Sequence, residues 1–337
     1  MVAGLDWPST MHQRRFGGTD LTTSEIAFGS WALGSDWWGE TDDPERLIGR
    51  ALELGVTFFD TGDAYGQGAN EEIVGRALAS AARDSVQIAT KFGYVLDSER
   101  RRHAEGERPQ DFSPEHARAA LESSLRRLGT DYVDLYQLHN PRMTAIESDE
   151  LFAELEALRG EGKVRAYGVA LGPAIGWRDE GLAAFRTRAV ASVQTVYNLL
   201  EQDPGADFLS AASDAGTGVM ARVPTSSGLL EDKYTLATTF TGNDHRRHRK
   251  REWLVQGLEK VERLRFLVIP GERSMTQAAL QFVLAQDAMA CVVPTVTTVA
   301  ELEEFAGAAT APPLTTGELD RIADLHATGF ELEPAST

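Results

Sequence analysis

The sequence predicts a (β/α)8 barrel with an N-terminal β-hairpin, forming one domain over residues 1–337. Short apolar strands alternate with amphipathic helices, which is the order that builds a parallel sheet. Eight such strands are spread over about the length that this barrel needs. The alternative is a doubly wound sheet with a second domain. It lacks support because no Gly-x-Gly-x-x-Gly motif follows the first strand and no change of composition marks a boundary.

The first elements are predicted from their turn residues. Gly17 and Gly18 lie between short β-prone pieces and predict the hairpin, and a first barrel strand is expected at residues 26–31. Pro44 near the start and Gly55 after the end delimit the first helix, because proline fits the first helical turn and glycine fits a helix C-terminus.

The alternation continues along the chain. Ser113 as N-cap and Pro114 at the first helical position mark the third helix. The other expected strands cover residues 56–60, 86–93, 132–139, 164–171, 192–198, 217–223 and 290–296. The expected helices cover residues 43–54, 70–80, 113–129, 148–160, 180–186 and 205–215, with a long helical region at 251–286.

The charge and the apolar pattern exclude two classes of partner. A net charge of −18 and a pI near 4.8 argue against nucleic acid and anionic membranes, which both attract a basic surface. The most apolar late stretch, residues 278–296, is interrupted by Gln281, Gln286 and Asp287, so it is too polar for a membrane helix. Cys291 is the sole cysteine, and the first ten residues lack the pattern of a secretory signal, so we expect a cytoplasmic protein.

Polar side chains follow three successive strands. Asp60 ends the second strand, Lys91 the third and His139 the fourth, and Tyr65 lies in the loop after Asp60. Because strand C-termini converge at one end of such a barrel, these four side chains are expected in one cleft. Taken singly, a residue such as Asp60 is more often a helix or turn cap, and one such as Tyr65 is usually a partly buried aromatic. His139 is as often a residue bonded to a nearby carbonyl. Their joint occurrence favours a site, in which no metal is expected.

The four residue types suit a reaction in which a carbonyl oxygen gains negative charge. A tyrosine hydroxyl titrates near 10, so Tyr65 stays protonated at neutral pH but releases its proton reluctantly. A buried Lys91 requires an acidic partner, for which Asp60 on the next strand is the candidate, and its ammonium would favour the phenolate. His139 would orient the carbonyl. The pattern predicts a proton-donor site beside a carbonyl that accepts hydride.

Six motifs in order resemble the aldo-keto reductase family from about residue 13 to residue 325: FFDTGDAYG, IATKFG, DLYQLHNP, EGKVRAYGV, VQTVYNLLEQ and SGLLEDKY. The resemblance implies an N-terminal hairpin before a (β/α)8 barrel and NAD(P)H-dependent interconversion of an aldehyde or ketone, including sugars, with an alcohol. Tyr65 would be the general acid, Lys91 and Asp60 would tune it, and His139 would position the carbonyl. The partner is a small molecule, and the oligomeric state stays open.

The resemblance also implies cofactor contacts, and this chain departs from several of them. Gln194 matches the residue that contacts the nicotinamide amide, and Asp60 would approach the ribose. Ala170 and Leu171 replace the Ser-Asn pair that holds the carboxamide. Arg222 replaces the aromatic residue that stacks on the nicotinamide, and its positive charge would favour the reduced, neutral ring.

The segment VVPTVTTVAELEEF, which includes Thr295, aligns with the family's adenosine-phosphate segment. Thr297 stands where the family has a basic residue for the 2′-phosphate, Glu301 where it has glutamine and Phe305 where it has asparagine. A carboxylate repels a phosphate, so the family's NADP preference is expected to weaken in favour of NAD. Arg273 or the basic cluster at residues 245–251 could instead supply the missing charge.

Two further features concern the mouth of the barrel. The basic cluster, HRRHRKR, is either a solvated helix start or a rim that attracts an anionic substrate. Trp31, Trp37 and Trp38 lie in the first βα loop and are expected to line the substrate pocket, or equally to cover the rim. Besides a reductase, two alternatives are open: a redox-sensing or partner-binding subunit that retains the cofactor, and a redox-neutral sugar-modifying enzyme with a bound dinucleotide.

Overall fold

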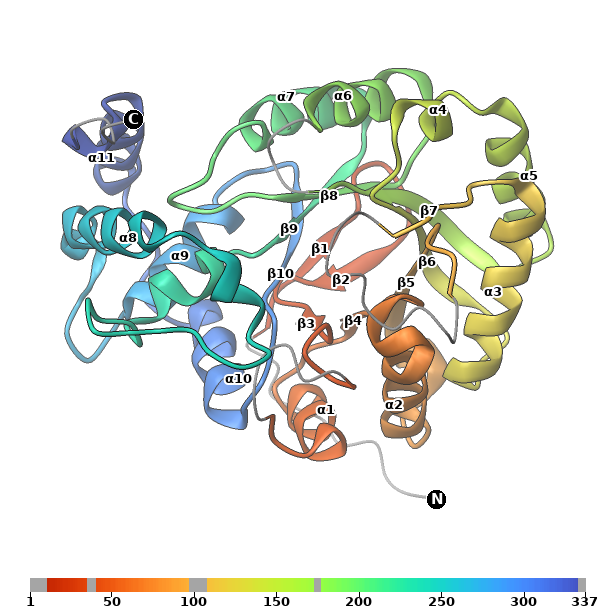
Figure 1. The fold of residues 1–337 in the computed structure, drawn as a ribbon, viewed down its shortest axis with the longest axis horizontal. Coiled ribbons are helices and arrows are strands. Elements are labelled where there is room, and N and C mark those ends of the chain that lie inside the picture. The colour runs from red at the N-terminus through yellow and green to blue at the C-terminus, as the bar shows by residue number, and fades with distance from the viewer. Residues whose placement is uncertain (1–10, 35–40, 97–107, 173–176, 333–337) are drawn as a thin grey trace.

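The computed structural model describes residues 11–34, 41–96, 108–172 and 177–332 and contains the predicted barrel and hairpin. Eight parallel strands form one sheet in the order of the chain, with helices around it (Figure 1). The strands are β3 (Phe28–Gly29), β4 (Phe58–Asp60), β5 (Gln87–Phe92), β6 (Val133–His139), β7 (Val164–Ala170), β8 (Ser192–Val196), β9 (Gly218–Arg222) and β10 (Met289–Val293).

The first and last strands close the ring. Parallel bridges join Ile26 to Val292 and Gly29 to Thr295. Gly29 is needed there, because a Cβ at this position would lie 2.4 Å from the carbonyl oxygen of Pro294. The predicted strand at residues 26–31 is therefore a short ladder of two residues, Phe28–Gly29, flanked by these isolated bridges.

Large and small apolar side chains together fill the barrel, and the hairpin covers its N-terminal end. The hairpin pairs β1 (Gln13–Arg15) with β2 (Thr22–Ser24) around the predicted glycines. Its Phe16 is fully buried with its ring centre 5.4 Å from that of Phe58. The interior cluster beneath it consists of Phe16, Leu21, Ala27, Phe58, Ala89, Leu135, Ala166, Ala191, Met220, Ala290, Cys291 and Val293. The interior at that end is packed, so a ligand must enter from the C-terminal ends of the strands.

The outer layer consists of helices whose caps follow the sequence signals. Asp43 caps the first helix ahead of Pro44, and Ser113 caps the third ahead of Pro114. The helices of eight or more residues are α1 (Pro44–Glu53), α2 (Ala69–Leu78), α3 (Pro114–Leu128), α5 (Asp149–Gly160), α6 (Arg178–Thr187), α7 (Gly205–Ala215), α8 (Arg251–Arg263), α9 (Met275–Leu284), α10 (Val299–Ala306) and α11 (Thr316–Ala327). A short α4 (Met143–Ile146) precedes α5.

The late helical region differs from the prediction. Residues 251–286 are not one helical stretch: α8 ends before a turn, and α9 starts anew at a capping box formed by Ser274 and Gln277. The sequence reasoning also assigned no helix after the last strand, where α10 and α11 follow. Their N-caps are Thr298 and Thr315, each bonded to the backbone N–H of a glutamate three residues later, a signal that was present in the sequence.

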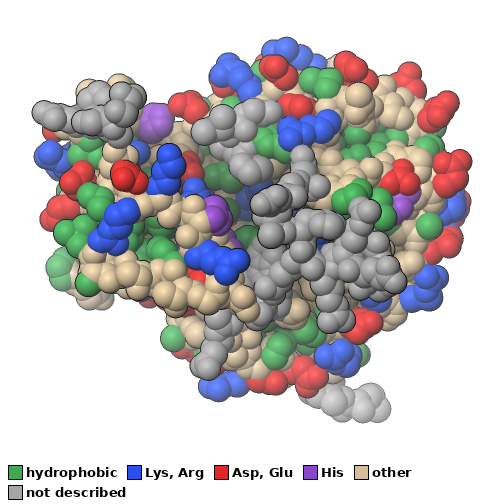
Figure 2. Space-filling model, in the orientation of Figure 1, with side chains coloured by type: hydrophobic (Ala, Val, Ile, Leu, Met, Phe, Trp, Pro, Cys, Tyr) green, Lys and Arg blue, Asp and Glu red, His purple; other side chains and the backbone are tan. Residues whose placement is uncertain are grey.

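Charge is spread over the surface. On the face shown in Figure 2, acidic and basic side chains alternate around the perimeter without a large basic area. Among the described residues, no helix combines the length and the apolar character that crossing a membrane requires.

Candidate active site

Strand register brings the predicted residues to one level of the barrel. Lys91 pairs with Gln137 across β5 and β6, His139 pairs with Ala170 across β6 and β7, and Ala170 pairs with Gln194 on β8. Lys91, His139 and Ala170 lie at the C-terminal ends of their strands, as expected for a barrel whose chemistry lies at that end, and Gln194 lies at the middle of β8.

Asp60 and Lys91 form a buried ion pair. The Nζ of Lys91 lies 2.6 Å from Oδ2 of Asp60 and donates a second 2.6 Å bond to the carbonyl of Thr61. Gln137, which the sequence reasoning did not select, donates to the other oxygen, Oδ1 of Asp60, at 3.2 Å. Burial lowers the pKa of Lys91, but the charge of Asp60 and the nearby Tyr65 outweigh it and raise the pKa, so the ammonium stays charged.

Tyr65 is brought over this pair by a constrained loop. Gly66 and Gly68 have φ of 58° and 93°, and a Cβ on Gly66 would lie 2.7 Å from the carbonyl oxygen of Gly34. Buried Asn70 accepts hydrogen bonds from Ser30 and Thr61 at 2.6 Å, which ties the end of the loop to the neighbouring strand. The Lys91 ammonium consequently lies 4.9 Å from the centre of the Tyr65 ring.

The environment of Tyr65 has two opposing effects on its acidity. Burial raises the pKa of the phenol, and the positive charges of Lys91 and Arg222 lower it. The sequence reasoning foresaw the effect of Lys91, but burial is the larger cause and the pKa is raised overall. The hydroxyl is therefore a protonated hydrogen-bond donor at neutral pH.

His139 is a neutral imidazole facing Tyr65. Their rings meet edge to face with centres 5.6 Å apart, and Tyr94 contacts the other side at 4.9 Å. Burial, followed by the charges of Lys91 and Arg222, lowers the pKa of His139 well below its usual value. An uncharged His139 donates one hydrogen bond without adding positive charge to the cleft.

Gln194 has a donor available for a ligand. Its side chain is buried, and within the described part of the chain its Nε2 has no hydrogen-bond partner. Such an unpaired amide is costly and favours a polar ligand at this point. The neighbouring Ala170 and Leu171 are buried, and their side chains carry no polar atom. The residues present therefore fit a carboxamide held mainly by Gln194.

Arg222 ends β9 and is directed toward the same cleft. Burial lowers the pKa of its guanidinium, while the electrostatic influence of Tyr65, Asp60 and Tyr94 opposes that shift. Within the described residues its Nε is buried without a hydrogen-bond partner. Arg222, which stands where the family has an aromatic residue, thus places a positive charge close to the Asp60, Tyr65 and Tyr94 side chains.

The N-terminus of α10, where the sequence predicts adenosine-phosphate contacts, is occupied by the chain's own acidic side chains. Glu301 accepts bonds from the backbone N–H and hydroxyl of Thr297 and from Lys233 at 3.1 Å. Asp42 accepts from the N–H of Val299 at 2.8 Å. Burial opposes ionisation of Glu301, but Lys233 and Thr297 outweigh it and lower its pKa, so the carboxylate is charged. Thr295 lies just upstream, bridged to Gly29.

Arg273 does not supply the missing phosphate-binding charge. It is 2% exposed, donates to the carbonyl of Leu267 at 2.8 Å and to those of Pro312 and Pro313, and is paired with Glu318. Its guanidinium is committed to holding the start of α11 against the turn before α9. The suggestion that it binds a 2′-phosphate is therefore wrong.

Most of the basic cluster, residues 247–251, is exposed at the start of α8, which agrees with a solvated helix start, whereas His245 and Arg246 are more enclosed. His245–His248 form a 3-10 helix in which Arg246 is buried and paired with Asp244 at 2.6 Å. His245 packs edge-on against Trp31 with ring centres 5.3 Å apart, and Trp31 lies 6.4 Å from Tyr65. Trp31 is thus beside the site, whereas Trp37 and Trp38 lie outside the described residues.

Comparison with known proteins identifies the chain. The sequence model of the Aldo/keto reductase family matches residues 25–327. The chain belongs to this family. Aldo-keto reductase YhdN of Bacillus subtilis is 33% identical over 80% of both chains, and the uncharacterized oxidoreductase YqkF of the same organism is 30% identical over 92% of this chain and 94% of YqkF.

Solved aldo-keto reductases share the fold. The holo form of AKR11C1 from Bacillus halodurans superposes with a TM-score of 0.75 at 29% identity, covering 94% of this chain and 96% of that one. The glycerol dehydrogenase AKR11B4 from Gluconobacter oxydans gives 0.78 at 28% identity, covering 96% and 98%. This aldo-keto reductase is therefore an oxidoreductase that acts on carbonyl or alcohol groups.

Proposed function

We propose that this aldo-keto reductase interconverts an aldehyde or ketone with its alcohol, using NAD(P)H, with Tyr65 as the general acid and base. The observation that supports this most is the Lys91 ammonium, which is bonded to Asp60 at 2.6 Å and lies beside the Tyr65 ring. A binding or sensing subunit needs no such donor group. When bound, the dinucleotide would supply the hydride to the carbonyl carbon.

Tyr65 donates a proton to the carbonyl oxygen as that oxygen gains negative charge. Its raised pKa keeps the proton in place until then, and Lys91 stabilises the phenolate left behind. Asp60 and Gln137 hold the lysine so that its charge faces the phenol. In the reverse direction the phenolate takes the proton of the alcohol.

His139 and Gln194 position the reactants. The neutral imidazole of His139 lies against the Tyr65 ring, where it donates to the same carbonyl oxygen without altering the charge of the site. Gln194 would hold the carboxamide of the dinucleotide through its unpaired amide, and Asp60 would approach the ribose. Alignment of the carbonyl carbon with the nicotinamide then depends on these two contacts.

We assign NADH as the better cofactor. The charged carboxylate of Glu301 accepts the hydrogen bonds of Thr297 and repels a 2′-phosphate at the start of α10. Lys233 is the nearest described cation, and it is already shared between Glu301 and Glu231. A ribose 2′-hydroxyl carries no charge and meets no such repulsion.

The substrate is a small carbonyl compound such as a sugar, an aldehyde or ketone whose reduction gives a polyol, or an aromatic aldehyde. The Trp31 ring lies 6.4 Å from that of Tyr65 and is buttressed edge-on by His245, and its apolar surface suits a ring or a short carbon chain. The related Gluconobacter enzyme is named a glycerol dehydrogenase, which agrees with a polyol as the alcohol.

The test is turnover with both dinucleotides. The purified protein is assayed for NADH and NADPH oxidation with glyceraldehyde, propanal and benzaldehyde, alongside Tyr65→Phe. We expect turnover by the wild type and a loss of about 100-fold or more in the variant, with dinucleotide binding retained. Unchanged turnover in Tyr65→Phe would contradict the role of Tyr65 as the general acid and base. A dinucleotide that copurifies and is never consumed with any carbonyl would favour the redox-neutral alternative.

A further inference from the structure

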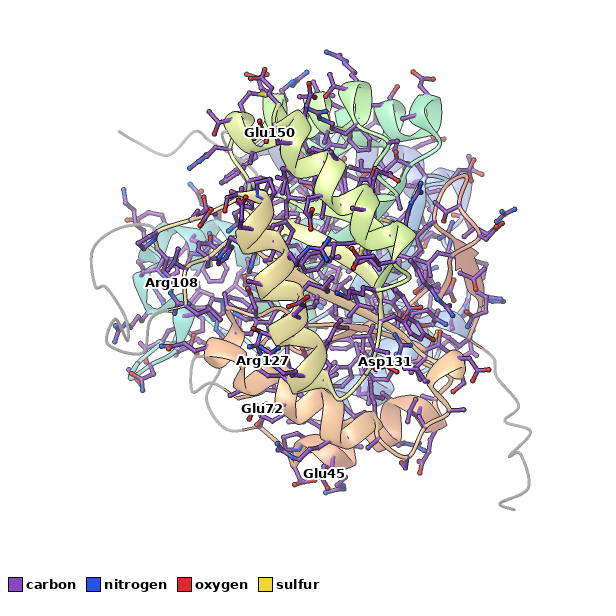
Figure 3. All side chains as sticks on the ribbon, turned by 90° about the vertical axis from the view of Figure 1, so that its right-hand side faces the viewer. Glu45, Glu72, Arg108, Arg127, Asp131 and Glu150 are labelled. Atoms are coloured by element: carbon purple, nitrogen blue, oxygen red, sulfur yellow. The ribbon has the colours of Figure 1, made fainter. Side chains whose placement is uncertain are left out.

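Three arginines converge on one surface depression between α2 and α3, on the outer layer of the barrel. The depression has a volume of about 460 Å³ and is lined by Glu72, Arg76, Ser123, Arg126 and Arg127. Figure 3 shows the labelled Arg127 and Glu72 close together where α3 passes α2. We call these five residues the arginine pocket.

The charge balance of the arginine pocket is unusual for this chain. Its three guanidinium groups share the space with one carboxylate, Glu72, although the protein carries a net charge of −18. Two other depressions contain as many carboxylates as arginines: one is lined by Glu259, Glu262, Glu331, Arg263, Arg265 and Arg321, the other by Asp207, Asp214, Arg178 and Arg186. Even when buried Glu71, which pairs with Arg127 from below, is counted, the arginine pocket keeps one guanidinium more than it has carboxylates.

The guanidinium groups also differ in what they already bind. Arg127 is held from below by buried Glu71, with its Nε 2.7 Å from Oε2. Arg126 donates to the hydroxyl of Ser123 at 2.9 Å, and within the described residues neither Arg126 nor Arg76 forms an ion pair with a carboxylate. Arg76 lies in the last turn of α2, and Arg126 and Arg127 lie in the last turn of α3, where the helix dipole favours basic residues. The dipole does not explain why the arginines of both helices line the same depression.

We propose that the arginine pocket binds a small phosphate-bearing anion. Guanidinium groups donate paired hydrogen bonds that match phosphate oxygens, and Ser123 adds a hydroxyl donor. Arg76 and Arg126 would be the principal ligands, since the charge of Arg127 is already compensated by Glu71. Arg127 contributes at the inner wall.

The site is linked to the catalytic strand. Glu71, which holds Arg127, also accepts a hydrogen bond from Thr90, the residue that precedes Lys91 in β5. The side chain of Arg127 also lies against Gly68, where a Cβ would approach its Cδ to 2.7 Å, and Gly68 belongs to the loop that carries Tyr65. The ligand would therefore lie outside the barrel, one contact removed from the active-site loop.

Equilibrium dialysis with inorganic phosphate at constant ionic strength tests the proposal, and no dinucleotide is added because its own phosphates would compete for the arginine pocket. The wild type should bind phosphate, and R76Q/R126Q should lose about 10-fold or more in affinity. R178Q/R186Q removes the same charge from a balanced depression and should bind as the wild type does. E72Q removes the one carboxylate of the arginine pocket and should bind several-fold more tightly.

Three results would overturn the assignment. One is a wild type that takes up no phosphate at millimolar concentration, and another is R76Q/R126Q retaining full affinity. The third is an equal loss in R178Q/R186Q, which would mean that overall charge alone governs binding. Because neither Arg76 nor Arg126 touches the Asp60 and Lys91 pair, R76Q/R126Q should keep the carbonyl turnover of the wild type, so failure here is distinguishable from failure of the proposed reaction.

Discussion

The Nζ of Lys91 lies 2.6 Å from Oδ2 of Asp60, and the two side chains are 1% and 6% exposed. Two charges taken out of water are costly to bury, and they are tolerated only because each compensates the other. The carbonyl of Thr61 also accepts a bond from Lys91, and Gln137 donates one to Asp60. The pair is thus a structural unit as well as the proposed source of the positive charge beside Tyr65.

Replacing Lys91 by methionine should destabilise the protein and remove activity together. The variant leaves Asp60 buried without its counter-charge, for which we expect a loss of about 3–5 kcal/mol in the free energy of unfolding in urea. The double variant D60N/K91M should recover part of this stability while remaining inactive. A Lys91→Met protein as stable as the wild type would contradict the described pairing.

Replacing His139 by glutamine should lower turnover without changing its pH dependence in the window around pH 6.5, where a free imidazole titrates. Burial and the charges of Lys91 and Arg222 hold the pKa of His139 well below 6.5, so the imidazole does not titrate in this window. The ratio of wild-type to variant kcat/KM, measured across the window, should stay constant. A ratio that changes near pH 6.5 would show that His139 gains a proton there.

Arg222 should make the protein favour the reduced dinucleotide. Its guanidinium repels the cationic ring of the oxidised form and not the neutral ring of the reduced form, so Arg222→Gln should tighten NAD⁺ binding roughly tenfold. Calorimetric titration of both forms measures this, and the affinity for NADH serves as the internal control. An equal change in both affinities would mean that Arg222 acts through shape and not through charge.

Glu301 should set the preference between the two dinucleotides. Glu301→Gln removes the carboxylate that faces the expected 2′-phosphate, and the ratio of kcat/KM for NADPH to that for NADH should rise about fivefold or more. Glu303→Gln is the matched control: it removes the same charge from α10, but Glu303 is paired with Arg50 on the exposed side. A similar rise in both variants would contradict a local effect of Glu301.

His245 should make stability depend on pH. Burial and the charge of Arg246 lower the pKa of His245 to about 4, below its usual 6.5. As the pH falls from 6.5 toward 4, His245 is protonated in the unfolded chain but stays neutral in the folded chain. The free energy of unfolding therefore decreases in that window. His245→Asn should reduce the loss by roughly 2–3 kcal/mol in urea unfolding at pH 7 and pH 4.

The control for this prediction is His248, which lies in the same 3-10 helix but is exposed. His248→Asn should show the same pH dependence as the wild type. If His245→Asn and His248→Asn behaved alike, the burial of His245 beside Arg246 would not be responsible for the effect.

Much of the barrel and part of the site followed from local patterns. Caps such as Ser113 and glycines such as Gly17 act on their immediate neighbours, so the sequence was enough to predict the helices and the hairpin. Asp60, Lys91 and His139 were selected because parallel strands end together at one rim of the barrel. This follows from the fold and requires no knowledge of the distances between the side chains. Two long regions were wrong: residues 251–286 concealed a new cap at Ser274, and the helices α10 and α11 after the last strand were missed.

Other features depend on how distant segments meet. Sequence alone could not show that Arg273 is enclosed by the start of α11, that Glu301 covers the N-terminus of its own helix, or that His245 packs on Trp31 from the other end of the chain. Protonation states belong to the same group, since burial is the largest cause of the shifts at Tyr65 and His139. Local patterns determine which elements form and which residue types stand at their ends. Burial and charge pairing depend on distances across the chain, so only the tertiary structure decided which of those residues hold a proton, a partner or a ligand.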